Sequence, residues 1–260
     1  MDRGQLYGDG FFETMLVDNG RIPLLPLHYS RIISTASRLR IDLPEACIDP
    51  GLLEQHLSHK IKGRSAARLR MNVIRNSGGL YTPQDDRGEM SFILSDYDNA
   101  LNKNKTVKEN IDIAESLRIF SGGLSNYKLL ARTEQVLLSL ERQDKGMDDL
   151  VVLNEKGEIV ECISSNIFFI DRENRHITPP LSCGALDGIM RKWVRDYLIS
   201  RGCDYVEKII RPDDLSCYRS AYCTNSLQGI VPIRRIAGNL YPVEEVIELS
   251  VAVASTALSR

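Results

Sequence analysis

Five short segments of unusual composition are spread through this 260-residue chain, and they restrict what it can fold into more than any other feature. In chain order they are residues 8–14 (GDGFFET), 125–128 (SNYK), 161–166 (ECISSN), 188–191 (GIMR) and 224–232 (TNSLQGIVP). One segment carries a lysine, and another carries a glutamate among apolar neighbours. The last two offer glycine backbone and hydroxyl groups that suit a bound anion. Each signal is weak when taken singly, and the information lies in their order and number.

The first 120 residues mix the periodicities of strands and helices. The pair Asn19-Gly20 between two apolar runs predicts a tight hairpin, because both residues adopt positive φ easily. Pro26 predicts the start of a helix that continues to Leu39. A second helix is expected over residues 51–61. The expected strands cover residues 11–17, 21–25, 67–74, 90–94 and 111–117.

A flexible connection at Ser121-Gly122-Gly123 predicts a domain boundary. We therefore expect a small N-terminal α/β domain over residues 1–120 and a larger C-terminal α/β domain over residues 124–260. In the second domain the expected helices cover residues 129–142, 188–199 and 243–257. The expected strands cover residues 150–153, 167–170, 205–210, 221–223 and 231–236. The predicted fold class is α/β (α+β) with two domains.

The bulk composition excludes several classes of protein. Charged residues make up 26% and hydrophobic residues 43%, which is typical of a globular chain. The net charge of -2 gives no general attraction to nucleic acid or to an anionic membrane. Six cysteines form no C-x-x-C pair and four histidines lack metal-site spacing, so we expect free thiols and no metal site. The polar start of the chain and the lack of a membrane-length apolar run favour a cytoplasmic protein.

Two segments hold candidate catalytic residues. A deprotonated lysine amine attacks an aldehyde and can later move a proton, and Lys128 follows the Gly-Gly connection just before a predicted helix. The structural alternative is a solvated lysine at a helix start. Glu161, between Val160 and Cys162, is hard to explain as a surface carboxylate. A buried ion pair is its structural alternative.

The five segments, in this order, resemble those of the fold-type IV enzymes that use pyridoxal phosphate. That family includes branched-chain and D-amino acid aminotransferases and 4-amino-4-deoxychorismate lyase, and the resemblance covers nearly the whole chain. It implies two domains with the cofactor between them, Lys128 as the Schiff-base lysine and Glu161 as the partner of the pyridine nitrogen. It also implies a homodimer, in which a loop of one subunit completes the other's pocket. Compared with that pattern, we expect the chain to lack the first strand that most relatives carry.

The resemblance also implies the ligands of the cofactor phosphate. The fourth segment matches the helix-entry cradle of the family, and the fifth matches a second phosphate-binding turn. An arginine in a His-x-x-Arg pattern matches a third contact, for which a surface or capping pair is the alternative. The residues matched in this way are Gly188, Ile189, Met190, Asn225, Ser226 and Arg31.

The resemblance leaves the reaction open. All members form an external aldimine with a small amino substrate and remove its Cα proton. A lyase then releases pyruvate and p-aminobenzoate in the folate pathway, whereas an aminotransferase needs a 2-oxo acid acceptor. The Asn-Ser-Leu-x-Gly turn at residues 225–229 and the loop at residues 75–79 favour the lyase. The alternative is an aminotransferase for branched-chain or D-amino acids.

The expected substrate contacts are Arg70, Phe12 and Arg87. Arg70 lines up with a basic residue that relatives use near the substrate carboxylate. Lyases continue the loop with Arg-Gly-Tyr, but this chain has Leu80-Tyr81, so Arg87 is the candidate replacement for that guanidinium. A third hypothesis is a catalytically silent binding protein, and the presence of Lys128 and Glu161 argues against it.

Overall fold

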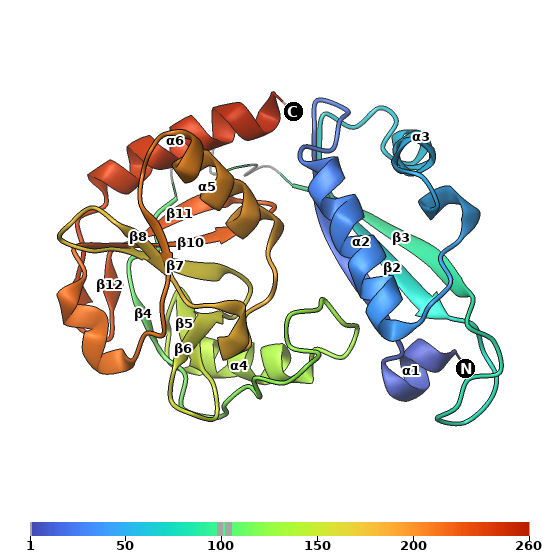
Figure 1. The fold of residues 1–260 in the computed structure, drawn as a ribbon, viewed down its shortest axis with the longest axis horizontal. Coiled ribbons are helices and arrows are strands. Elements are labelled where there is room, and N and C mark those ends of the chain that lie inside the picture. Colours follow the sequence, from blue (N-terminus) through green and yellow to red (C-terminus); the bar gives the residue numbers. More distant parts are fainter. Residues whose placement is uncertain (1, 98–100, 102–105, 260) are drawn as a thin grey trace. The chain divides into compact units, whose positions relative to one another are not determined.

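Two compact units, each with its own hydrophobic core, make up the chain (Figure 1). The computed structural model describes residues 2–97, 101 and 106–259. Unit 1 consists of Met1–Ala100, Tyr127–Arg132 and Leu258–Arg260, and unit 2 consists of Leu101–Asn126 and Thr133–Ala257. The predicted mixture of helices and strands is confirmed. No helix in the described part of the chain is long and apolar enough to cross a membrane.

Unit 1 is built on a three-stranded antiparallel sheet in the order β1-β2-β3. Apolar side chains of this sheet share one core with the two long helices of the unit. Side chains along β2 alternate between buried and half-buried, as the alternation in the sequence predicts. The strands are β1 (Gly10–Asp18), β2 (Ala66–Arg75) and β3 (Gly88–Asp96). The helices are α1 (Arg3–Tyr7), α2 (Leu25–Leu39), the 3₁₀ turn η1 (Glu45–Cys47) and α3 (Pro50–Lys60).

The hairpin predicted across Asn19-Gly20 is wrong. The turn forms, with φ values of 49° and 71°, but only one isolated bridge, between Asp18 and Arg21, flanks it. β1 pairs along its whole length with β2 instead. Pro23 carries no N–H group for a ladder, and α2 begins at Leu25, so no room remains for a second strand.

Unit 2 contains two five-stranded sheets, in the orders β11-β10-β7-β8-β9 and β13-β12-β4-β5-β6. The first comprises β7 (Asn166–Ile170), β8 (His176–Thr178), β9 (Tyr205–Glu207), β10 (Ser220–Asn225) and β11 (Gly229–Ile233). The second comprises β4 (Ile111–Ile113), β5 (Asp149–Leu153), β6 (Ile159–Cys162), β12 (Arg235–Ile236) and β13 (Asn239–Leu240). The helices are α4 (Thr133–Asp144), α5 (Ile189–Ser200), α6 (Glu244–Leu258) and the 3₁₀ turns η3 (Leu181–Cys183) and η4 (Pro212–Cys217).

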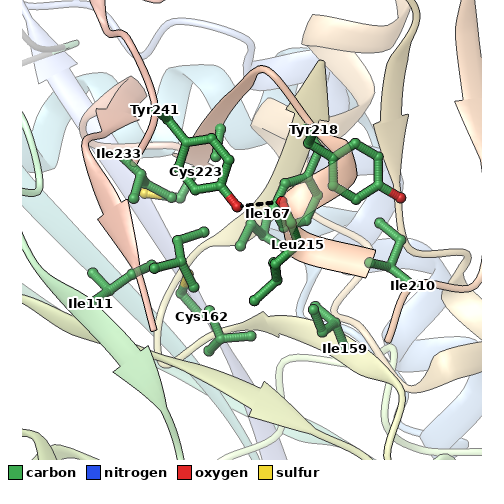
Figure 2. Packing of buried hydrophobic residues seen from close by; sticks show 14 of the residues in the cluster. Ile111, Ile159, Cys162, Ile167, Ile210, Leu215, Tyr218, Cys223, Ile233 and Tyr241 are labelled. Carbon is green, nitrogen blue, oxygen red and sulfur yellow. Dashed lines mark hydrogen bonds between the residues drawn. The ribbon is translucent and has the colours of Figure 1, made fainter. Parts of the chain in front are cut away.

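Side chains from both sheets of unit 2 meet in one core (Figure 2). Cys162 of β6 and Cys223 of β10 both lie in this core, and neither is exposed. The Tyr241 hydroxyl donates a hydrogen bond to the Leu215 carbonyl over 2.8 Å, which satisfies a polar group inside the cluster (Figure 2). The strands that carry the third and fifth segments therefore share one packed interior.

Residues Tyr127–Arg132, here called the lysine segment, belong to unit 1 although the chain before and after them belongs to unit 2. The Phe12 N–H donates to the Lys128 carbonyl over 2.9 Å, and the Leu130 N–H donates to the Gly10 carbonyl over 3.1 Å. These bonds to β1 explain why the helix expected from residue 129 begins only at Thr133. The expected boundary at residues 121–123 lies inside unit 2, and the chain crosses between the units more than once.

Candidate active site

Lys128 lies on β1, against a residue of the first segment. Its Nζ atom is 4.6 Å from the centre of the Phe12 ring, and its backbone carbonyl accepts the Phe12 N–H. The Phe12 side chain is buried within unit 1. A buried strand therefore supports the lysine directly, whereas the sequence placed it at the entrance of a helix.

Two glycines of the first segment permit this contact. A Cβ atom on Gly10 would overlap the Val73 carbonyl oxygen and would lie 2.8 Å from a methyl group of Leu130. A Cβ atom on Gly8 would lie 3.1 Å from the Ala131 Cβ, and Gly8 has a φ of 65°. The two glycines of the Gly-Asp-Gly pattern therefore let the lysine segment pack closely against the first segment. The first two segments are in direct contact for this reason.

Two arginines accompany Lys128 around the same aromatic ring. The Arg70 guanidinium carbon lies 3.7 Å from the Phe12 ring centre, and that of Arg132 lies 5.8 Å from it. Arg70 also donates to the Asn72 side chain over 2.8 Å. Burial lowers the pKa of Arg70, and the positive charges of Arg68 and Arg132 lower it further. Sequence reasoning missed Arg132, although it follows Lys128 by four residues.

Arg31 is buried in an ion pair with a residue of the first segment. Its Nε and Nη2 atoms donate to the two carboxylate oxygens of Glu13 over 2.6 and 2.7 Å. His28 Nδ1 lies 2.9 Å from Glu13 Oε2 and must donate, because an ionised carboxylate only accepts. The structure therefore shows Arg31 as the partner of Glu13.

Electrostatics hold this buried network in one protonation state. Burial alone would raise the pKa of Glu13, but Arg31 and His28 together lower it to about 2. Burial lowers the pKa of His28 despite its bond to Glu13, and the charges of Arg31 and Lys128 lower it further. Glu13 is therefore ionised and His28 neutral at neutral pH, so the network provides a fixed scaffold beneath α2.

Glu161 lies at the end of β6 in unit 2, and two donors hold its carboxylate. The Asn166 side-chain amide donates to Oε2 over 3.1 Å, and the Leu186 N–H donates to the same oxygen over 3.0 Å. Asn166 also donates to the Leu186 carbonyl over 2.9 Å. The third segment thus contains both the carboxylate and the residue that orients it.

Gly188 is the N-cap of α5 and touches the same asparagine. A Cβ atom on Gly188 would overlap Asn166 Oδ1, so only glycine leaves room for that side chain. No side chain in the described part of the chain caps this helix. Ile189 and Met190, which follow, are buried. A helix start that exposes backbone N–H groups at its positive end suits a phosphate.

The Asn225 side chain builds the turn between β10 and β11. Its Oδ1 atom accepts the N–H groups of Leu227 and Gln228 over 3.1 and 2.8 Å, and Ser226 lies within the turn. Its amide donates to Ser165 Oγ over 3.1 Å, which links the fifth segment to the third. Unit 2 therefore gathers the third, fourth and fifth segments, whereas unit 1 contains the first segment and the Tyr127-Lys128 half of the second.

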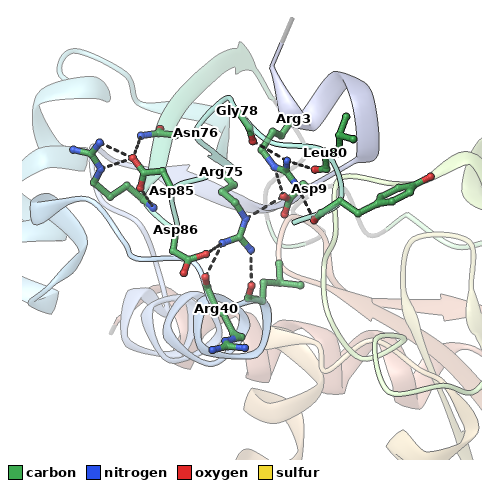
Figure 3. Close-up of polar contacts among 12 residues, drawn as sticks. Arg3, Asp9, Arg40, Arg75, Asn76, Gly78, Leu80, Asp85 and Asp86 are labelled. Carbon is green, nitrogen blue, oxygen red and sulfur yellow. Dashed lines mark hydrogen bonds and ion pairs between the residues drawn. The ribbon is translucent and has the colours of Figure 1, made fainter. Parts of the chain in front are cut away.

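The loop over residues 76–87 is anchored in unit 1 by Arg75, which is buried (Figure 3). Arg75 donates to Asp9 over 3.0 Å, to Asp86 over 2.5 Å and to the Arg40 carbonyl over 2.7 Å. Asp9 also accepts from Arg3 over 2.7 Å. This arginine ties both ends of the loop to the first segment and to the end of α2.

Arg87 lies in the same loop, with a side chain that is 75% exposed. Its Nε atom donates to Asp85 over 2.7 Å, and its hydrogen bonds lower the pKa of Asp85 to about 2. Leu80 and Tyr81, at the far end of the loop, are also exposed. Arg75 thus holds the base of the loop, and Arg3 holds the Leu80 carbonyl at the tip over 2.6 Å while the side chains there stay exposed.

The family model described as amino-transferase class IV matches residues 10–236, which is most of the chain. The chain belongs to this family. Class IV aminotransferases depend on pyridoxal phosphate, so the predicted cofactor is confirmed for the family to which this enzyme belongs. The expected fold-type IV architecture is confirmed as well.

The relatives of this chain are named for different activities. An aminodeoxychorismate lyase from Vibrio harveyi is 26% identical over 239 residues, 91% of this chain and 86% of that protein. A D-alanine aminotransferase from Bacillus licheniformis is 24% identical, with coverage of 91% and 82%. The structure of 4-amino-4-deoxychorismate lyase from Pseudomonas aeruginosa superimposes with a TM-score of 0.85 at 25% identity, with coverage of 100% and 94%.

The residues of this chain are of the types that pyridoxal phosphate requires. Glu161 has an oriented carboxylate, the kind of group that pairs with a protonated ring nitrogen, and Lys128 has a primary amine. The start of α5 supplies the positive helix end that a phosphate prefers, and Gly188 keeps the backbone there accessible. Each type of donor that the cofactor requires is therefore present.

Proposed function

We propose that this class IV aminotransferase-family enzyme is a 4-amino-4-deoxychorismate lyase that releases p-aminobenzoate and pyruvate. The observation that carries the proposal is the turn at Asn225. The amide of Asn225 accepts two N–H groups of the turn and donates to Ser165, so its side chain specifies the turn's shape. Lyases carry Asn-Ser-Leu-x-Gly here, whereas aminotransferases carry a Ser-Thr turn. A lyase is also among the relatives that match most of the chain.

The residues of the chain take distinct roles in this proposal. Pyridoxal phosphate, when bound, supplies a sink for the electrons released at the substrate Cα. Lys128 binds the cofactor aldehyde and moves the Cα proton. Glu161, oriented by Asn166, keeps the ring nitrogen protonated. The start of α5 and the Asn225-Ser226 turn bind the phosphate, with Arg31 as a further contact.

Substrate carboxylates require cationic partners, and Arg70 is the first candidate. Phe12 and Asn72 fix its guanidinium, so little rotamer entropy remains to be lost when a carboxylate binds. Arg87 is the candidate for a second carboxylate, because its exposed guanidinium is oriented by Asp85. Removing Arg70 should raise KM and lower kcat/KM while leaving the cofactor bound.

The alternative function is that of an aminotransferase for branched-chain or D-amino acids. Leu80 and Tyr81 stand where the lyase loop carries a guanidinium, and both are exposed at its tip. A substrate with a single carboxylate would not need this second guanidinium. The D-alanine aminotransferase among the relatives agrees with this alternative.

The deciding experiment incubates the purified protein with 4-amino-4-deoxychorismate and no added 2-oxo acid. A lyase forms pyruvate and p-aminobenzoate in equal amounts, because aromatisation of the ring makes the step nearly irreversible. The Lys128→Ala variant should show neither product and should lose the visible absorption of the lysine-bound cofactor. Turnover that requires 2-oxoglutarate with L- or D-amino acids, and forms no p-aminobenzoate, would establish the aminotransferase instead.

A further inference from the structure

Arg132 donates hydrogen bonds to the backbone on both sides of Lys128. Its Nη2 atom donates to the Tyr127 carbonyl over 2.9 Å, and its Nε atom donates to the Leu129 carbonyl over 3.1 Å. A planar guanidinium holds two acceptors in a fixed relative position, which a lysine ammonium cannot do. The two residues that flank the proposed cofactor lysine are therefore held by one side chain.

The backbone around Lys128 needs such support. Residues 127–132 form neither a helix nor a named strand, so no regular ladder fixes their dihedral angles. Two backbone hydrogen bonds to β1, at Lys128 and Leu130, hold one side of the segment. Arg132 supplies donors to the carbonyls of Tyr127 and Leu129, which half-buried backbone groups require.

The Arg132 guanidinium also lies beside the aromatic ring that Lys128 contacts. The guanidinium carbon and the Lys128 Nζ atom lie 5.8 and 4.6 Å from the centre of the same Phe12 ring. Arg132 therefore bonds to the backbone of the lysine segment and also lies beside the ring that the Lys128 amine contacts.

We propose that Arg132 is a positioning residue that fixes the lysine segment and presents the Lys128 amine to the cofactor. The role extends the proposed function, because it depends on Lys128 as the residue that binds the cofactor. It does not depend on whether the enzyme is a lyase or an aminotransferase.

The first test needs no cofactor. Hydrogen exchange followed by mass spectrometry would compare the wild type with Arg132→Met, which keeps the length of the side chain but removes its donors. The Arg132→Lys variant keeps the charge alone. Arg118→Met is the matched control, because Arg118 also donates to two backbone carbonyls, those of Ala114 and Leu117, over 2.8 and 3.1 Å.

We expect the peptides that contain Phe12 and Leu130 to exchange about 10-fold faster in Arg132→Met, because their N–H groups bond to a segment that has lost its support. Arg132→Lys should behave similarly, and Arg118→Met should match the wild type in these peptides. Circular dichroism would verify that each variant is folded. Wild-type exchange in a folded Arg132→Met protein would overturn the proposal.

The second test adds pyridoxal phosphate. Borohydride reduction followed by peptide mapping should show slower trapping of the cofactor on Lys128 in Arg132→Met. With the substrate that the deciding experiment of the proposed function establishes, kcat should fall about 10- to 100-fold with little change in KM, as expected for a misplaced catalytic group. Arg132→Lys should restore neither the rate of trapping nor kcat, because an ammonium cannot hold both carbonyls in place. A rise in KM alone would make Arg132 a substrate contact and overturn the positioning role.

The two proposals fail in different ways. If Lys128→Ala kept the visible absorption of the bound cofactor, the proposed function would be wrong while the exchange result would still stand. If Lys128→Ala lost that absorption and Arg132→Met matched the wild type in trapping and kcat, only the positioning role would be wrong.

Discussion

At the scale of single residues, Glu161 depends on donors that come from outside its own strand. The Asn166 amide and the Leu186 N–H both bond to Oε2, so the carboxylate is oriented by the protein itself. We expect Glu161→Gln to keep pyridoxal phosphate bound but to slow turnover by about 10²–10³-fold, because a neutral amide cannot hold the ring proton. Single-turnover kinetics at saturating cofactor would measure the effect. Unchanged turnover would remove Glu161 from the mechanism.

Gly188 provides a steric test of the same network. The added methyl group of Gly188→Ala would overlap Asn166 Oδ1 and displace the side chain that orients Glu161. We expect a stability loss of about 1–3 kcal/mol and weaker cofactor binding. Gly51→Ala is the matched control in the first turn of α3, where the added methyl group meets only the end of the Asp49 side chain. Urea denaturation and fluorescence titration with the cofactor would separate the two effects, and equal behaviour of both variants would contradict the steric argument.

At the scale of secondary-structure elements, long periodic stretches were predictable and short, tertiary-dependent ones were not. The alternation in β2 and the apolar spacing in α2 predicted those elements to within about two residues, because burial on one face determines them. The strand expected over residues 21–25 failed because Asn19-Gly20 indicates a turn but does not determine the conformation of the residues after it. The late start of α4 depends on bonds between the lysine segment and β1, which no local pattern encodes.

The candidate site shows the same division. Motifs predict Lys128 and Glu161 as site residues, because each lies in a segment of distinctive composition. Asn166 and Arg132 were missed as site residues, because their roles arise from contacts with Glu161 and with the lysine segment. The sequence places Arg75 in a lyase-like loop. In the structure Arg75 is buried and holds that loop through Asp9 and Asp86.

His176 makes the stability of β8 dependent on pH. Its Nδ1 atom lies 2.9 Å from the Tyr222 hydroxyl, and burial lowers its pKa from 6.5 to about 4. Between pH 6.5 and pH 4 the unfolded chain therefore binds a proton here that the folded chain does not. The free energy of unfolding should consequently fall as the pH is lowered through this window. Burial lowers the pKa of His28 too, which contributes with the same sign.

The variant His176→Gln should reduce this pH dependence, because it removes the titrating group. The slope of the free energy of unfolding against pH should differ between the wild type and the variant. For one proton this difference cannot exceed about 1.4 kcal/mol per pH unit. Urea unfolding at pH 7, 6 and 5 would measure it. The pH range of this experiment lies above the ordinary pKa of carboxylates. Groups such as Glu13 therefore contribute little to the pH dependence of the free energy of unfolding in this range. Identical slopes for the wild type and the variant would show that His176 is not the source.

At the scale of the whole molecule, we propose that the enzyme is a homodimer, as its family membership implies. The 76–87 loop supports this, because Arg75 and Asp9 hold its base while Leu80 and Tyr81 remain 78% and 88% exposed at its tip. Apolar side chains on a rigid loop are typical of contact sites. Light scattering of the wild type should give the mass of a dimer.

Replacing both Leu80 and Tyr81 by Asp should weaken the dimer and lower activity, since charged groups would have to be desolvated in the contact. Ile48→Asp is the control, because Ile48 is also an exposed apolar residue of unit 1. Sedimentation velocity at several protein concentrations would detect the change. A stable, fully active monomer in the wild type would contradict the prediction.

The crossing of the lysine segment into unit 1 has a consequence for synthesis on the ribosome. The carbonyl of Gly10 and the N–H of Phe12 find their partners only in residues 128–130, which emerge from the ribosome more than a hundred residues later. During synthesis, all three strands of unit 1 are therefore made before the residues that complete the hydrogen bonds of β1. Unit 1 cannot finish folding until the lysine segment has emerged. A nascent chain stalled before the lysine segment should remain sensitive to protease near β1, and one stalled well beyond Arg132 should become resistant.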